Sequence, residues 1–284
     1  MSSRHPNTQS DGGEVSLGYV INRRIAALDP VEDNEEVARL TFEVLHGDPI
    51  AVHAVYLIGF SRQVAVPEIA QVIYRGGGGK NLRDVAGRTD DTLALFGAFL
   101  HWGHSSPRGR GAIARMEQIH ARFTITDEQK LYTLATLIFE GERIGSHLGF
   151  DPFTANQREA SWRFWRGVAE QMPLEGLPPT AEELWRWMLE YERQHWRYSD
   201  EGRQVVDRFF EDWAMRWFPR RARPLARQTL LALLDDDLRA VLRLENPSRP
   251  VARLLRASAR AYLPLTQIRP LPTNRSWMDY YGQR

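Results

Sequence analysis

Apolar residues recur at helical spacing through nearly all of this chain, and this periodicity constrains the fold more than any other feature. After the first thirteen residues, no segment shows sustained alternation of apolar and polar residues between hairpin turns. The pattern predicts an all-α fold made of a single multi-helix domain. A chain of 284 residues with 43% hydrophobic content is long enough to enclose the core of such a domain.

Residues that cap helix N-termini mark several helix starts. In a capping box, a Thr side chain accepts a hydrogen bond from the first turn, and a Gln or Glu three residues later bonds back. The pairs that fit are Thr126 with Gln129, Thr154 with Gln157, and Thr180 with Glu183. From these signals and the periodicity we expect helices at 34–46, 49–60, 66–74, 83–103, 109–122, 127–146, 155–172, 181–197, 201–217, 224–233 and 248–262.

The two ends of the chain differ from the helical part in composition. Residues 1–13 are polar and Gly-rich, which predicts a disordered leader before a helical domain over residues 14–263. Residues 264–284 contain Pro264, Pro270 and Pro272, so we expect a tail that lies extended over the surface or is loosely ordered.

Composition excludes several classes of chemistry and of partner. The chain has no Cys, which rules out disulfides, Cys-ligated zinc, iron–sulfur clusters and a Cys-ligated haem. Its 37 basic and 36 acidic residues nearly cancel, and the basic run at 219–223 is more typical of helix capping, so we expect no nucleic-acid partner. No apolar run approaches the ~20 residues of a membrane span, and no secretory signal is visible. We therefore expect a cytoplasmic protein without a transmembrane segment.

His120 stands on the apolar stripe of the helix expected at 109–122. Ile113, Met116, His120 and Phe123 follow i, i+3, i+7 and i+10 spacing, which places the imidazole on the face directed at the core. Taken alone, a core His held by one hydrogen bond is the more common interpretation. The other interpretation is an axial metal ligand or a catalytic base.

The preceding helix carries a polar patch. Arg88, Asp91 and Thr92 stand at i, i+3 and i+4, next to an apolar continuation of the same face. A pair between Arg88 and either neighbour that only anchors the helix would explain this patch. The functional interpretation is a cluster that steers dioxygen or a polar group of a substrate.

Two Glu-x-x-His motifs form a third set, Glu117 with His120 and Glu192 with His195. This spacing occurs in di-iron carboxylate bundles, which also need a Glu from each of two other helices. Candidates for those positions are Glu140 or Glu142 and Glu159 or Glu170. Against the di-iron interpretation, Glu117 falls on the flank of its helix, a position typical of solvent exposure.

Five blocks in register resemble those of the MpaB and rubber-oxygenase (latex-clearing protein) catalytic-domain family, over about residues 40–260. They are residues 87–92, 114–123, 126–134, 157–166 and 191–195. The resemblance implies a haem b-dependent oxygenase fold, with haem between the helices, that uses dioxygen on a lipophilic, isoprenoid-like or secondary-metabolite substrate and in some members cleaves a C=C bond. It implies His120 as the haem iron ligand, and Arg88 and Thr92 as members of the distal cluster. Asp91 stands where the family has Lys, and this reversal of charge argues against polyisoprene as the substrate.

Carried onto this chain, the resemblance implies that Arg88 stabilises negative charge on oxygen, while Asp91 orients Arg88, takes a proton from the substrate, or passes protons through Thr92. We expect an apolar channel for the substrate, lined by Leu95, Phe96, Phe99, Phe164 and Trp165. His53, His147 and His195 remain open as sixth ligands of the iron. The alternatives are a di-iron oxidoreductase on Glu117, His120, Glu192 and His195, or a non-catalytic helical protein that binds haem or another ligand.

Overall fold

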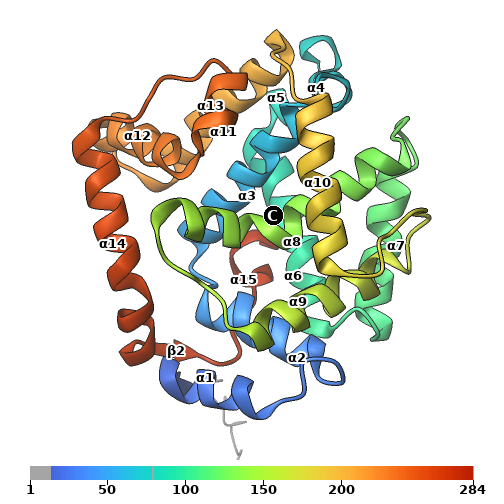
Figure 1. The fold of residues 1–284 in the computed structure, drawn as a ribbon, viewed down its shortest axis with the longest axis vertical. Helices are drawn as coiled ribbons and strands as arrows, with labels where there is room; N and C mark the ends of the chain where they lie inside the picture. The colour runs from blue at the N-terminus through green and yellow to red at the C-terminus, as the bar shows by residue number, and fades with distance from the viewer. Residues whose placement is uncertain (1–13, 79, 284) are drawn as a thin grey trace, which may run out of the picture.

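The computed structural model describes residues 14–78 and 80–283, and over these residues the chain is built almost entirely from helices (Figure 1). The expectation of an all-α fold is confirmed. The helical elements are α1 (Gly18–Ala27), α2 (Asn34–Arg39), the π-helix η1 (Leu40–Leu45), α3 (Pro49–Val64), α4 (Pro67–Tyr74), η2 (Arg75–Gly77), α5 (Lys80–Arg83), α6 (Val85–Trp102), α7 (Pro107–His120), α8 (Asp127–Leu148), α9 (Ala155–Ala169), α10 (Ala181–His195), α11 (Asp200–Trp217), η3 (Arg220–Ala222), α12 (Arg223–Leu233), α13 (Asp236–Val241), α14 (Arg249–Ile268) and α15 (Met278–Tyr281).

The capping residues found in the sequence do begin helices. Thr126 and Thr154 each form both hydrogen bonds of a capping box, at the starts of α8 and α9. Thr180 accepts a hydrogen bond from the Glu183 backbone N–H at the start of α10. These side chains satisfy N–H groups that a first helical turn leaves unpaired, which is why the boundaries could be predicted from sequence.

The core contains two large apolar clusters that meet along α3 and α8, at the centre of Figure 1, and a smaller third cluster between α1, α2, η1 and α9. The first cluster joins α3 to α11, α12 and α14, around the fully buried Phe210. The second joins α6, α7, α8, α9 and α10, around the fully buried Phe99 and Phe164. Tyr56 and Trp196 are half-buried and pack against both clusters. α3 and α8 thus hold the two halves together.

A network of charged side chains crosses this centre. On α3, Arg62 pairs with Glu140 of α8 at 2.5 Å and with Asp235 at the start of α13 at 2.6 Å. Arg143 of α8 donates two hydrogen bonds to Glu192 of α10, at 2.6 and 3.0 Å. Because each of these buried charges faces an opposite charge, four helices can bring them into the core together.

The C-terminal tail is part of the core, which corrects the expectation of an extended or loose segment over 264–284. α14 runs through Pro264 to Ile268, and the chain then forms β2 (Pro270–Pro272), which pairs with β1 (Val15–Leu17) in an antiparallel sheet. The buried carboxylate of Glu43 accepts hydrogen bonds from the Ser276 hydroxyl at 2.8 Å and from the Trp277 backbone N–H at 3.0 Å. The tail then ends in α15, whose contacts with α6 place the C-terminus near the centre of Figure 1.

Other parts of the fold were not expected from the sequence, namely α1, α5, α13, α15 and the small sheet. The disordered leader expected over residues 1–13 lies outside the described residues. Within the described ranges, no single helix is long and apolar enough to cross a membrane. One pair of helices, α3 and α4, has the length and apolar composition of a broken span, but the two are bent by 113° relative to each other.

Candidate functional site

The helical hairpin of α6 and α7 positions the residues that the sequence singled out. Gly103 ends α6 with a φ of +75°, a conformation that favours glycine, and the Ser106 side chain caps α7 by accepting from the Gly109 N–H at 2.9 Å. Because this connection is short and the two helices pack together, the first turns of α6 lie beside the last turn of α7. Arg88 and His120 therefore come close enough for the charge of Arg88 to lower the pKa of His120.

His120 is a half-buried imidazole at the end of α7, on the stripe that the sequence predicted. Ile113 on the same stripe is fully buried, and Met116 packs against the second apolar cluster. Burial lowers the pKa of His120, and the charges of Arg88 and Lys130 lower it further, so the ring is neutral at pH 7. Its Nδ1 is buried without a hydrogen-bond partner in the described structure. The structure therefore does not show the first interpretation of His120, a core His held by a hydrogen bond at its Nδ1.

Glu117 lies one turn before His120, and its position differs from the solvent-facing flank expected from the sequence. Its Oε2 is buried and has no hydrogen-bond partner among the described residues. Positions i and i+3 are neighbours on a helix surface, so α7 presents two unpartnered polar atoms within one turn. Native proteins pair the great majority of buried polar atoms, so such a concentration indicates a site that a bound group completes.

Arg88 and Thr92 form the polar side of the site. The Arg88 guanidinium donates a hydrogen bond to the Thr92 hydroxyl, which itself donates to the Arg88 carbonyl at 2.9 Å. Tyr56 of α3 joins them: burial raises the pKa of its phenol, while the charge of Arg88 and a hydrogen bond with Thr92 oppose that shift. The helix-anchoring pair between Arg88 and Thr92 is thus present, but within a cluster that also includes a tyrosine.

Asp91 is placed differently from its neighbours on α6. It is exposed, while Arg88 and Thr92 are half-buried. The buried carboxylate of this turn is instead Asp90, which pairs with Arg216 of α11 at 2.5 Å. The polar patch read from the sequence is therefore divided between the Arg88–Thr92 cluster in the hairpin and the Asp91 carboxylate at the surface, while the ion pair to α11 is made by Asp90.

The five apolar side chains expected to line a channel pack as core. Phe96 and Trp165 meet edge to face with ring centroids 5.9 Å apart, and Phe164 packs against Trp165 at 5.5 Å. Phe99 and Phe164 are fully excluded from solvent, and Leu95 packs against the same cluster. In this structure these residues make a closed aromatic wall behind α6, not an open channel.

The structure does not bring the residues of the di-iron interpretation together. Within the described part of the chain, no three His, Asp or Glu side chains come together in a way that could hold a metal ion. Glu192 is bound by Arg143, and the His195 ring stacks on Tyr191, its Nδ1 lying 3.0 Å from the Tyr191 carbonyl oxygen. The other candidate carboxylates also pair with Arg: Glu140 with Arg62, Glu142 with Arg158, Glu159 with Arg163 and Glu170 with Arg166.

The remaining candidate histidines lie on other elements. His53 is fully buried on α3, and its Nδ1 accepts a hydrogen bond from the Trp217 indole N–H at 2.9 Å. His147 is half-buried near the end of α8, where burial and the charge of Arg239 lower its pKa. Neither has a hydrogen bond or ring contact with His120, so a sixth ligand of an iron stays a prediction.

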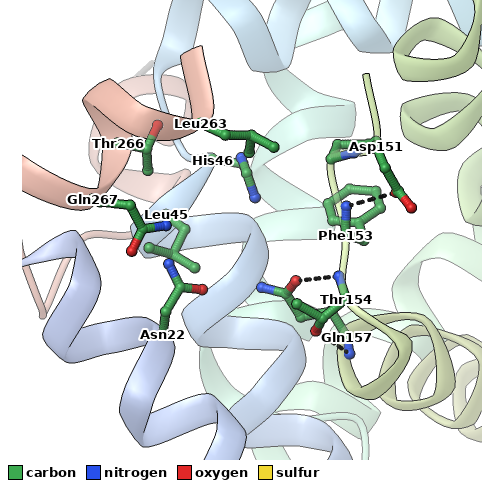
Figure 2. Close-up of a pocket in the computed structure, with 11 residues that line it drawn as sticks. Asn22, Leu45, His46, Asp151, Phe153, Thr154, Gln157, Leu263, Thr266 and Gln267 are labelled. Carbon is green, nitrogen blue, oxygen red and sulfur yellow. Dashed lines mark hydrogen bonds between the residues drawn. The ribbon is translucent and has the colours of Figure 1, made fainter. Parts of the chain in front are cut away.

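A separate cavity of about 220 Å³ lies between α1, η1, the start of α9 and the end of α14. Figure 2 shows the His46 ring in the middle of this space, between Asn22 and Gln267 on one side and Phe153 on the other. The His46 Nδ1 lies 2.8 Å from the Tyr262 hydroxyl. α14 and α7 lie on opposite sides of the molecule in Figure 1, so this cavity is not part of the His120 site.

A comparison with known protein families shows which family the chain belongs to. Residues 44–264 match the model of a family described as ER-bound oxygenase mpaB/B'/Rubber oxygenase, catalytic domain. The chain belongs to this family. The resemblance inferred from the five sequence blocks is thereby confirmed, and at a coarse level the protein is an oxygenase catalytic domain. No curated protein matches the chain.

Sequence reasoning missed two members of the site. The sequence places Tyr56 in a helix without linking it to the site, and it indicates Glu117 only as a di-iron ligand. Nothing in the order of residues shows that α3 passes beside the first turns of α6. A Glu three residues before a candidate ligand His was the only available signal for Glu117.

Proposed function

We propose that this protein is a haem b-dependent oxygenase that uses dioxygen to oxidise a lipophilic small molecule, and that His120 would hold the iron. One observation carries the proposal: the Nδ1 of His120 is buried without a partner, on a ring that is neutral at pH 7. Neutral imidazole is the form that ligates haem iron. The absence of Cys leaves His as the most suitable ligand in the hairpin.

The residues around His120 fit such a group. When bound, haem would supply the redox chemistry with dioxygen, which no protein side chain here can perform. Arg88 provides a fixed positive charge beside His120, and such a charge stabilises negative charge that develops on oxygen or on a substrate. Thr92 accepts from Arg88 and so holds the guanidinium on this side of α6.

A proton donor is available beside the cluster. Tyr56 shares the Thr92 hydroxyl and stays protonated near neutral pH because burial raises its pKa, so its phenol would be a hydrogen-bond donor to a reacting group. Asp91 lies on the exposed side of the same turn, and we assign it no contact with substrate.

A lipophilic substrate is what membership of this oxygenase family supports. Beyond Thr92, Leu95 and Phe96 of α6 pack against α9 as core, so the support for this substrate class comes from the family and not from an open apolar surface.

The experiment is an absorption spectrum of the purified protein and its His120→Ala variant, with a pyridine haemochrome assay for stoichiometry. We expect a Soret band in the wild type that His120→Ala abolishes. His195→Ala is the matched control, since it also removes a half-buried His in the last turn of a helix and should keep the band. A wild type that is colourless, iron-free and unable to take up haem would refute the proposal.

Turnover is tested separately from haem binding. With haem loaded, Arg88→Gln should lower oxygen consumption on lipophilic substrates about 10²-fold or more, the usual loss for removing one charge-stabilising donor. Arg115→Gln, on the exposed face of α7, serves as control. A haem-loaded wild type that consumes no oxygen with any such substrate would favour the non-catalytic haem-binding alternative.

A further inference from the structure

Helix α14 carries two parallel stripes on its outer half. The first is a row of arginines spaced i, i+4, i+7 and i+11, namely Arg249, Arg253, Arg256 and Arg260. The second, rotated by about a third of a turn, holds Leu254, Leu265 and Ile268, which are 66%, 58% and 68% exposed. The opposite half of the helix, with Ala259 and Thr266 buried, packs against α1 and α12. Figure 1 shows α14 along one edge of the molecule.

The arginine stripe has no counter-charge of its own. None of the four guanidiniums makes an ion pair or a hydrogen bond with a described residue. From residue 246 to residue 278 the sequence has no Asp or Glu, while it has six Arg. About half of the other Arg side chains in the described ranges form ion pairs with carboxylates, whereas none of these four does, in a chain whose net charge is only +1.

Further exposed apolar side chains gather at the C-terminal end of α14. Gly18 lies against the Thr266 and Gln267 backbone, where a Cβ would come within 1.8 Å of the Thr266 oxygen, and this close approach packs β1 and α1 onto the helix. Val15, Leu17, Tyr19 and Val20 on those two elements are all exposed. Together with the three on α14 they make seven of the fourteen exposed large hydrophobic side chains in the described residues.

We propose that α14 is a docking surface for an anionic phospholipid bilayer, on which the helix lies parallel to the membrane plane. The arginines would bind lipid phosphates, and Leu254, Leu265 and Ile268 would enter the boundary between headgroups and acyl chains. Adjacent basic and apolar stripes on an exposed amphipathic helix are the features by which helices bind at membrane interfaces. This inference goes beyond the proposed function and does not depend on haem.

Other occupants fit this surface less well. A nucleic acid would satisfy the arginines but leave the leucine and isoleucine stripe in water. A second copy of the chain packed through α14 would place Arg against Arg, because this helix has no carboxylate to offer in return. Anionic lipid provides both the negative charge and the apolar phase in one ligand.

The test is cosedimentation of the full chain with vesicles of phosphatidylglycerol and phosphatidylcholine in equal parts, against vesicles of phosphatidylcholine alone. We expect binding to the anionic vesicles that is weakened by salt, and little binding to the neutral ones. Arg253→Gln/Arg260→Gln should lower the partition coefficient about 25-fold, at about fivefold for each arginine near an anionic surface. Leu254→Ser/Leu265→Ser should lower it at least about tenfold.

The matched control is Arg115→Gln/Arg186→Gln, which removes the same charge from exposed positions on α7 and α10. It should bind anionic vesicles within about twofold of the wild type, since neither residue lies on α14. The proposal is overturned if the wild type does not sediment with anionic vesicles, or if both double-arginine variants lose binding equally. It is also overturned if the wild type is a dimer in solution that Leu254→Ser/Leu265→Ser converts to a monomer.

Discussion

Replacing Arg62 by Met tests whether the charge network at the centre of the fold stabilises it. The Arg62 side chain is 1% exposed and its Nε lies 2.5 Å from Glu140, whose side chain is 3% exposed. Burial alone would lower the pKa of Arg62, but Glu140 and Asp235 raise it, so the guanidinium is charged at any accessible pH. Without Arg62, no cation remains in hydrogen-bond contact with Glu140 in the described structure. Removing one partner of a buried pair costs about 3–5 kcal/mol.

That free energy converts to a measurable shift in melting temperature. Unfolding entropy is about 2.1 cal/mol/K per residue near 60 °C, which gives about 0.6 kcal/mol/K for a chain of this length. Arg62→Met should therefore lower Tm by about 5–8 °C, measured by calorimetry and by urea unfolding at pH 7. Arg163→Met is the control, because Arg163 and Glu159 form an exposed i, i+4 pair and its loss should change stability by less than about 0.5 kcal/mol.

The double variant Arg62→Met/Glu140→Met distinguishes the cost of leaving Glu140 unpaired from the cost of losing the packing of the Arg62 side chain. Replacing both charges by apolar groups of similar length removes the unpaired carboxylate, so stability should return to within about 1 kcal/mol of the wild type. Asp235 keeps its hydrogen bond from the Leu238 backbone N–H and lies 3.7 Å from Arg143. A double variant that is less stable than Arg62→Met would show that the damage comes from the shape of the Arg62 side chain, and would refute the reasoning.

Two further outcomes follow from the core. Burial, and then the charge of Arg216, lower the pKa of His53 to about 3, so its neutral form stabilises the fold above pH 6.5 and this stability is lost as pH falls. Between pH 7 and pH 5 the wild type should lose about 2 kcal/mol that His53→Leu does not lose in urea unfolding, and equal losses in both would contradict this. Gly18→Ala should destabilise by at least about 2 kcal/mol, because the new Cβ meets the backbone of Thr266, whereas Gly111→Ala, in open space on α7, should stabilise slightly. An unchanged Tm for Gly18→Ala would mean that α1 is not held against α14.

Helix positions were predictable where local chemistry decides them. A Thr at the N-cap acts on N–H groups within its own turn, so α8, α9 and α10 begin where the sequence indicated. The sequence predicts an end of α14 at residue 262, before Pro264, but the helix continues through this proline to Ile268. The tail was misjudged for a related reason: its proline content says nothing of Glu43, which lies more than 200 residues away and binds the backbone before α15.

The site was predictable only as far as single helices define it. The position of His120 on an apolar stripe and the pairing of Arg88 with Thr92 both follow from 3.6-residue periodicity. Which of two adjacent carboxylates faces inward does not, because that choice depends on Arg216, supplied by α11. The sequence indicated Asp91 as the carboxylate of the site, whereas the fold buries Asp90 and leaves Asp91 exposed.

The two Glu-x-x-His motifs show how far such reasoning can extend. Their spacing is identical, yet Glu192 is held by Arg143 of α8, while the buried Oε2 of Glu117 has no partner among the described residues. What separates a structural motif from a candidate ligand site is therefore the set of side chains that neighbouring helices bring to it. The same argument applies to α14, where no neighbouring element supplies a carboxylate to the arginine stripe. In both places the residues that the protein leaves unpartnered are the ones that indicate a ligand from outside the chain.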